Sequence, residues 1–178
     1  MFIIATLGAT LLSATPVDPL YLQRSHKIKN MKIIVEYASQ HKQDPYELLA
    51  IALTESNLNS KALSNKGAIG LFQVMCKYWY KPLGYESLNV CNKKLYIPIN
   101  NVRAGVKVLS TVRKKYSQCQ GVLAYRCYFA GQGWKRFGPR TTAAIIRYEN
   151  KVKEKRRMLL LHYKKLIDGM ISNREKRI

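Results

Sequence analysis

Apolar residues recur every three or four positions over most of the chain, which predicts α-helices. The predicted helices cover residues 29–42, 45–57, 69–78, 99–116, 119–130 and 141–172. Three segments between them contain Gly, Pro, Ser or Asn and predict loops or irregular chain, over 59–68, 80–98 and 131–140. No useful stretch alternates apolar and polar residues, so the predicted fold class is all-α.

Two of these helices carry further sequence signals. Asp44 is a good N-cap, Pro45 suits the first helical position, and Glu47 completes a capping box, so a helix should run from here to about Asn57. The helix over 141–172 has a strongly basic face opposite an apolar one, which carries Ile145, Tyr148, Val152, Leu159, Tyr163 and Leu166.

These elements divide the chain into four parts. Residues 1–18 hold an apolar run of about 12 residues, shorter than a membrane span, and predict an export signal, a hydrophobic anchor or a segment packed in a larger assembly. Residues 19–43 form a lead-in and a helix, residues 44–152 the main domain, and residues 153–178 a basic helical extension.

The formal net charge is +21, which is extreme for 178 residues. Such a charge favours polyanionic partners, whether nucleic acid, anionic lipid or the acidic polymers of a bacterial envelope, and does not choose among them. No nucleic-acid-binding module is recognisable, so no specific nucleic acid is expected. The basic extension either lies on an anionic membrane or is the solvated outer face of a packed helix.

The four cysteines form no C-x-x-C pair and have no histidines spaced beside them, so neither a metal nor a cofactor is expected. In an oxidising compartment, disulfides between Cys76 and Cys91 and between Cys119 and Cys127 would each close a short loop. The alternative is four reduced, partly buried thiols.

Glu55 is a carboxylate on an apolar helix face, following Leu48, Ile51 and Ala52 at spacings of seven, four and three residues. Burial and the negative end of the helix dipole both disfavour its anion, which predicts a pKa of about 6 and a competent general acid. The alternative is a glutamate that caps a backbone group or pairs with a lysine.

Carboxylates are scarce around Glu55. Between Glu47 and Glu149 the only acids are Glu55 and Glu86, and nothing in the sequence connects these two. Ordinary glycosidases use two carboxylates. A glycan-cleaving site in this chain would therefore use one carboxylate and an internal nucleophile supplied by the substrate.

A longer motif begins at Glu55 and resembles the first motif of the lytic transglycosylases of the soluble-lytic, goose-lysozyme-like class. It reads Glu55-Ser56, then Asn59, Ala62 and Ser64, then GAIGLFQVM as far as Met75. The segment NNVRAGVKVLSTV is similar to the second motif of that class through Asn101 and Gly105.

The segment CYFAGQG resembles the third motif of the class. Phe129 stands where the family usually has Asn, while the matching residues are Tyr128, Ala130, Gly131 and Gly133. Tyr148 matches a tyrosine of the following helix. The resemblance spans residues 44–152 and implies a lysozyme-like single domain whose substrate groove crosses Glu55, followed by a long basic C-terminal helix.

The resemblance also implies a reaction. Glu55 would protonate the glycosidic oxygen between N-acetylmuramic acid and N-acetylglucosamine, and would then act as base toward the muramyl 6-hydroxyl, which closes a 1,6-anhydro ring. The expected partner is the glycan strand of peptidoglycan, and the expected location is the periplasm or cell envelope after export.

Eight further residues are implied at this site. Substrate-binding roles are implied for Ser64, Gln73, Met75, Asn101, Tyr128 and Tyr148, and close backbone approach for Gly67 and Gly70. Structural roles stay open for several of them: Ser64 can end a turn, Met75 and Tyr128 can belong to the core, and the glycines can serve only the bend.

Two other functions stay open. A goose-type muramidase would use water in the same fold, and a non-catalytic protein would hold glycan as a structural component of a virion or secretion machine. An anionic envelope surface, a phage virion and a secretion apparatus accordingly remain open as partners, and virion association remains open as a location.

Overall fold

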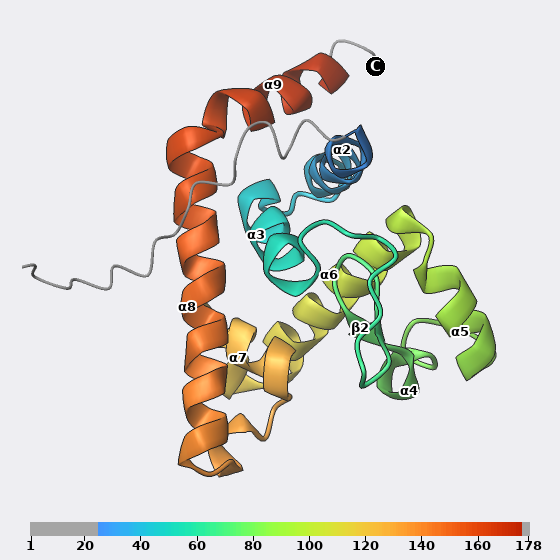
Figure 1. Ribbon diagram of the computed structural model, residues 1–178, viewed down its shortest axis with the longest axis vertical. Helices are drawn as coiled ribbons and strands as arrows, with labels where there is room; N and C mark the ends of the chain where they lie inside the picture. The colour runs from blue at the N-terminus through green and yellow to red at the C-terminus, as the bar shows by residue number, and fades with distance from the viewer. Residues whose placement is uncertain (1–24, 176–178) are drawn as a thin grey trace, which may run out of the picture.

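A computed structural model describes residues 25–175 of the chain, and helices are its main elements (Figure 1). They are α2 (Ser25–Gln40), α3 (Pro45–Glu55), α4 (Cys76–Trp79), α5 (Leu88–Leu95), α6 (Pro98–Lys115), α7 (Leu123–Ala130), α8 (Pro139–His162) and α9 (Lys164–Glu175). The predicted all-α class is confirmed. The segment expected to be an export signal or anchor, 1–18, lies outside the described residues, as does the lead-in as far as residue 24. Within 25–175 no helix is both long and apolar enough to cross a membrane.

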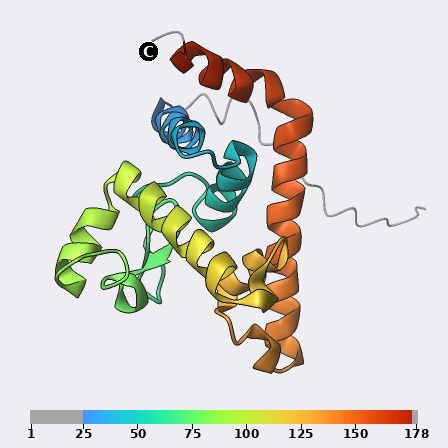
Figure 2. The same ribbon diagram turned by 180° about the vertical axis from the view of Figure 1, so that it is seen from behind.

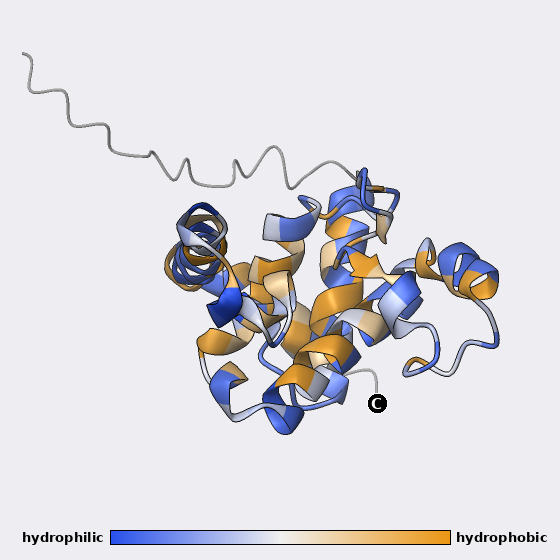
Figure 3. Ribbon diagram, turned by 90° about the horizontal axis from the view of Figure 1, so that it is seen from below, coloured by the Kyte–Doolittle hydropathy of each residue, from blue (hydrophilic) through white to orange (hydrophobic). Residues whose placement is uncertain are grey.

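Helix α3 lies in the middle of the fold and packs against α8 and α2 (Figures 1 and 2). Helix α8 runs along one side of the molecule, and α9 turns from its end to pack on α2. All residues of α3 from Leu48 to Leu53 are buried. Hydrophobic segments gather where the helices meet, while much of the outer surface is hydrophilic (Figure 3). The core is therefore built around the helix that ends at Glu55.

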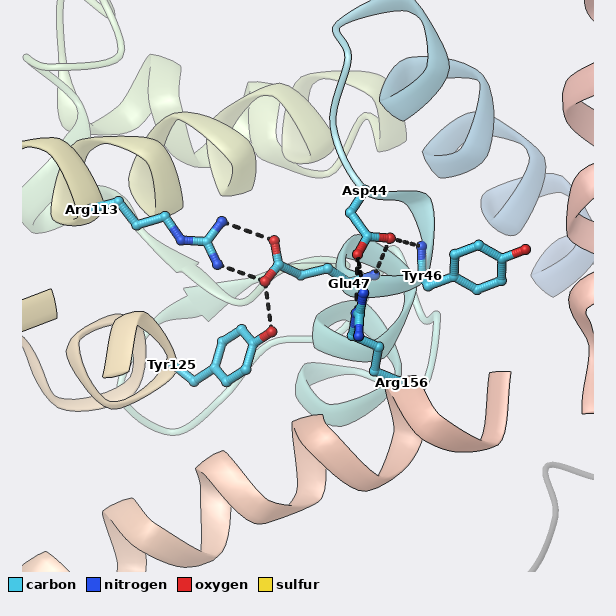
Figure 4. Close-up of polar contacts among 6 residues, drawn as sticks. All are labelled: Asp44, Tyr46, Glu47, Arg113, Tyr125 and Arg156. Carbon is cyan, nitrogen blue, oxygen red and sulfur yellow. Dashed lines mark hydrogen bonds and ion pairs between the residues drawn. The ribbon is translucent and has the colours of Figure 1, made fainter. Parts of the chain in front are cut away.

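The first turn of α3 begins as predicted, with Asp44 as its cap. One Asp44 carboxylate oxygen accepts hydrogen bonds from the backbone N–H groups of Tyr46 at 2.9 Å and Glu47 at 3.2 Å. The other oxygen accepts from Arg156 of α8 at 2.7 Å (Figure 4). The cap therefore satisfies the helix start and also ties α3 to α8.

The predicted capping box is wrong, because Glu47 points away from the start of its own helix (Figure 4). Both of its carboxylate oxygens accept from the guanidinium of Arg113 on α6, at 2.6 and 2.9 Å. Tyr125 of α7 donates a third hydrogen bond at 2.6 Å. Charge-assisted bonds of this bidentate kind are strong, and they hold α3 against two more helices.

Helix α3 ends at Glu55, two residues before the predicted end. Asn57 and Leu58 have φ values of 54° and 61°, in the left-handed region that ends a right-handed helix. The turn they make places Glu55 at the last position of the helix.

The predicted helix over 69–78 is wrong except for its last turn, α4. Strand β1 (Ala68–Ile69) instead pairs antiparallel with β2 (Val74–Met75), and Ala68 lies opposite Met75. Gly70 and Gln73 have φ values of +72° and +46°, which a continuous helix does not allow. Strands of two residues are too short to show an alternating pattern, so only the helical spacing was visible in the sequence.

The segment predicted to be irregular, 80–98, contains helix α5. Ser87 caps it by accepting a hydrogen bond from the backbone N–H of Val90 at 3.2 Å. A disulfide between Cys91 of α5 and Cys76 of α4 joins the two helices. The second predicted disulfide, Cys119–Cys127, is also present and links the turn before α7 to α7 itself.

Removal of the Cys76–Cys91 disulfide should destabilise the fold. The bond closes a loop with a sequence separation of 15, and the lost loop-closure entropy corresponds to about 3 kcal/mol of unfolding free energy. Urea denaturation of the Cys76→Ala/Cys91→Ala variant should therefore show a clearly lower midpoint than the wild type. Equal midpoints for the two proteins would contradict this role of the bond.

The single helix predicted over 141–172 is broken at Tyr163, which has φ −120° and separates α8 from α9. The break shifts the buried face of the chain beyond it. Ile167 is therefore fully buried, whereas Leu166, predicted to face the core, is 47% exposed. The other five residues of the predicted apolar face are buried as expected: Ile145, Tyr148, Val152, Leu159 and Tyr163.

Candidate active site

Glu55 lies on the wall of a pocket of about 320 Å³ between α3, α7 and α8. Its side chain is partly buried and partly open to this pocket. The other lining residues are Thr54, Phe129, Ala144, Arg147, Tyr148 and Lys151, and we call this cavity the Glu55 pocket. Glu55 is the only carboxylate among them.

Tyr148 of α8 holds the Glu55 side chain in place. Its hydroxyl donates a hydrogen bond to Glu55 Oε1 at 2.6 Å. Burial raises the pKa of Glu55 from 4.5 to about 7, and the hydrogen bond from Tyr148 lowers it by a smaller amount. The carboxyl group therefore exchanges its proton near neutral pH, which suits a group that must act as both acid and base.

Tyr128 and Tyr148 both remain neutral phenols. Burial, with the nearby charge of Glu55 as a further cause, raises the pKa of each hydroxyl well above its usual value. Tyr128 donates to the backbone oxygen of Phe72 at 2.7 Å, so its hydroxyl holds the turn between β1 and β2 and does not bond to the carboxylate. The two tyrosines thus connect the Glu55 environment to α7, α8 and the hairpin.

Phe129 gives the Glu55 pocket an apolar wall. Its ring is stacked on the ring of Tyr148, with 4.7 Å between the ring centroids, and the residue is 49% exposed. An aromatic face is therefore available at the position where the motif that this segment resembles usually has Asn.

Ser64 and Gln73 brace the loop that leads into and out of the hairpin. Ser64 Oγ accepts from the backbone N–H groups of Lys66 and Ala68, at 3.3 and 3.0 Å. Gln73 Nε2 donates to the backbone oxygens of Ala62 and Gly70, at 3.3 and 3.1 Å. Within the described residues neither side chain bonds to Glu55, so Ser64 does not orient the carboxylate directly.

The substrate-binding role expected for Asn101 is wrong, because this side chain is fully buried. Its amide oxygen accepts from the backbone N–H of Phe72 at 2.8 Å, and its amide nitrogen donates to the backbone oxygens of Ile69 and Leu95. Asn101 therefore satisfies three buried backbone groups and fixes the hairpin to α6.

The backbone-approach role expected for Gly70 is wrong for a related reason. Gly70 is buried, and a Cβ added to it would lie 2.3 Å from Asn101 Nδ2. This glycine makes room for Asn101 and permits a φ of +72°. Gly67 also has a positive φ, but it is exposed and has open space around it. Met75 is partly buried in β2.

Ser56 contributes a contact that the sequence did not reveal. Its hydroxyl donates to the backbone oxygen of Leu71 at 2.9 Å and so ties the end of α3 to the hairpin turn. The motif contains Ser56 beside Glu55, and this adjacency was the available clue. Arg147 and Lys151 were visible only as part of a basic helix face, because nothing local relates them to a glutamate more than 90 residues earlier in the chain.

A family model described as the transglycosylase SLT domain matches residues 32–154. Among solved structures, the chain is similar to an inactive Glu-to-Gln mutant of the lytic transglycosylase Slt from Pseudomonas aeruginosa. The identity is 23% with a TM-score of 0.52, and the match covers 79% of this chain and 24% of that one. This likeness supports the fold.

The 70 kDa soluble lytic transglycosylase of Escherichia coli also matches, with 22% identity and a TM-score of 0.49, over 78% of this chain and 23% of that one. The chain thus spans about a quarter of the length of either solved structure. The family match itself extends over more than half of this chain, from the middle of α2 into α8. The chain therefore belongs to the family of the transglycosylase SLT domain.

Proposed function

We propose that this chain is a peptidoglycan lytic transglycosylase that cleaves the β-1,4 bond between N-acetylmuramic acid and N-acetylglucosamine. Membership of the family supports this class of reaction. The observation that carries the proposal is Glu55, a carboxyl group with a pKa of about 7 on a pocket wall where the described lining residues include no second carboxylate. Glu86, the other acid between Glu47 and Glu149, is exposed in the link between α4 and α5 and does not line this pocket.

The proposed reaction needs only one carboxyl group. Protonated Glu55 donates its proton to the glycosidic oxygen while the bond from that oxygen to the muramyl C1 breaks, which releases a neutral alcohol. The Glu55 carboxylate then takes the proton of the C6 hydroxyl on the same muramyl residue as O6 bonds to C1. Glu55 ends as it began, protonated, and no water is consumed.

The surrounding residues support each half of this cycle. Tyr148 donates to Glu55 and stabilises the carboxylate that the first step produces, while remaining protonated itself. Tyr128 holds the hairpin turn beside the end of α3. Substrate contacts are also proposed for four residues of the β1–β2 hairpin and the loop before it. These residues are at least partly exposed, and they are Ser64, Gly67, Gln73 and Met75.

Phe129 is proposed as an apolar platform for a sugar ring. Its Phe129→Ala variant should show a KM about tenfold higher with a similar kcat, since covering roughly 50 Å² of apolar ring surface is worth about 1.3 kcal/mol. Steady-state kinetics on solubilised glycan strands give both constants. A fall in kcat at unchanged KM would contradict the platform role and would point to a loss of support for Tyr148.

An oxidising, polyanion-rich compartment such as the periplasm or cell envelope fits this proposal. Two disulfides are formed among the described residues, and such bonds persist in oxidising compartments. The net charge of +21 would concentrate the protein on an envelope that carries carboxylates and phosphates.

Incubation with purified sacculi tests the proposal. The wild type should lower the turbidity of the suspension and release soluble muropeptides. A protein that sediments with the sacculi and releases nothing would instead be a glycan-binding structural component, and the enzymatic proposal would fail.

A further inference from the structure

Three cations follow one another along one face of α8, and the first two of them lie on the wall of the Glu55 pocket. Arg147 and Lys151 line the pocket, and the charge of Lys151 is close enough to Lys155 to contribute to its lowered pKa. Successive members are four residues apart, so they lie on one helix face and extend over about 12 Å. We call Arg147, Lys151 and Lys155 the α8 basic stripe.

Three other cations of α8 have acidic partners, which the members of the stripe, like Arg140 at the start of the helix, lack among residues 26–173. Lys153 pairs with Glu149, Arg156 with Asp44, and Arg157 with Glu154. Among the side chains of residues 26–173, no carboxylate forms an ion pair with any member of the stripe. Like charges on successive turns repel one another, so this face is destabilised unless an anion binds there.

The pocket itself does not supply that anion. Its one carboxyl group, Glu55, is bonded to Tyr148 and has a pKa near neutrality. Burial also disfavours the ammonium group of Lys155. A bound anion would offset this cost of burial and the repulsion from the charge of Lys151. An elongated ligand with several negative charges matches three cations spread over this length.

We propose that the α8 basic stripe binds the carboxylates of the peptide stem attached to the muramyl residue that lies in the Glu55 pocket. This rests on the proposed function, and it adds recognition of the peptide to cleavage of the glycan. A peptide of five residues spans up to roughly 17 Å when extended, which is long enough to follow the stripe. The protein would therefore prefer strands whose stems are present and charged.

Three substrates separate the sources of negative charge. They are glycan strands with native stems, the same strands with stem carboxylates converted to amides, and strands freed of stems, which keep only the lactyl carboxylate. The wild type should show a kcat/KM about 10- to 100-fold higher on native strands than on amidated strands, as expected for one or two charge-assisted contacts. Equal values on native and stem-free strands would overturn the proposal.

Two double variants test whether the preference for charged stems comes from the α8 basic stripe. Arg147→Gln/Lys151→Gln should bring the ratio of kcat/KM between native and amidated strands close to one. The matched control is Arg103→Gln/Lys107→Gln, which removes the same Arg and Lys pair at the same spacing from a different pocket on α6. The control should keep the wild-type ratio. An equal loss in both variants would show a general charge effect and would overturn the assignment to the stripe.

A binding measurement separates failure of this inference from failure of the proposed function. If the wild type cleaves none of the strands, the proposed function fails. Calorimetric titration of the Glu55→Gln protein with a free acidic stem peptide then still tests the stripe. Binding that is lost on adding Arg147→Gln/Lys151→Gln supports the inference, and binding that is absent, or unchanged by that addition, overturns it.

Discussion

Replacement of Glu55 by Gln is expected to lower kcat by about 10³-fold or more, because the amide can neither donate the proton to the leaving oxygen nor accept one from the 6-hydroxyl. The rate of muropeptide release from sacculi measures the loss. Glu86→Gln, which removes an exposed carboxylate away from the Glu55 pocket, is the matched control and should keep wild-type activity. Equal loss in both variants would contradict the assignment.

The same Glu55→Gln variant should be more stable than the wild type in alkaline buffer. The pKa of Glu55 is raised from 4.5 to about 7 on folding, so the folded state binds its proton more tightly than the unfolded state. The contribution of Glu55 to stability is therefore fully present below pH 4.5 and is lost as the pH rises through about 7. At pH 8 the amide should add up to about 3 kcal/mol to the unfolding free energy. A less stable variant at pH 8 would mean that inactivity reflects misfolding.

The second large effect is expected from Tyr148→Phe, which removes the hydrogen bond to Glu55 and keeps the ring that stacks on Phe129. This bond favours the carboxylate, so its loss should raise the pKa of Glu55 further above its folded value of about 7. Because the first step needs protonated Glu55, activity falls as pH rises through this pKa, and the falling limb should move to higher pH in the variant.

The maximum rate of Tyr148→Phe should also be lower, by about tenfold, because the carboxylate formed in the first step loses a donor worth about 1.4 kcal/mol. A pH profile of kcat/KM and of kcat measures both effects. Tyr37→Phe is a suitable control, because this tyrosine lies on α2 and does not line the Glu55 pocket. An unchanged pH limb in Tyr148→Phe would show that the hydroxyl does not act on Glu55.

The central residue of the site could be recognised from the sequence, because it depends on local spacing. An acid on an apolar helix face predicts a buried carboxyl group with a raised pKa, and the structure gives Glu55 that environment. Its hydrogen-bond partner was not predicted: the motif indicated Tyr148 only as a substrate-binding residue, and the two residues are 93 positions apart in the chain.

Asn101 shows why other parts of the site could not be predicted. A polar side chain in a motif reads equally well as a ligand of the substrate or as a partner for buried backbone groups, and only the three backbone contacts decide for the second. The interpretation of Gly70 depended on the same side chain. A Cβ at this position would clash with Asn101, so the glycine is needed for packing inside the fold. The role of Arg147 likewise depends on the packing of α8 against α3, which no local pattern encodes.

The account rests on a single carboxyl group that closes the sugar on itself without water. Digestion of sacculi in water labelled with heavy oxygen, followed by mass spectrometry of the released muropeptides, tests this directly. The account predicts muramyl products that are one water lighter than hydrolysis products and carry no heavy oxygen from the solvent. Products of full hydrolytic mass with the label at the muramyl end would contradict it and identify a muramidase.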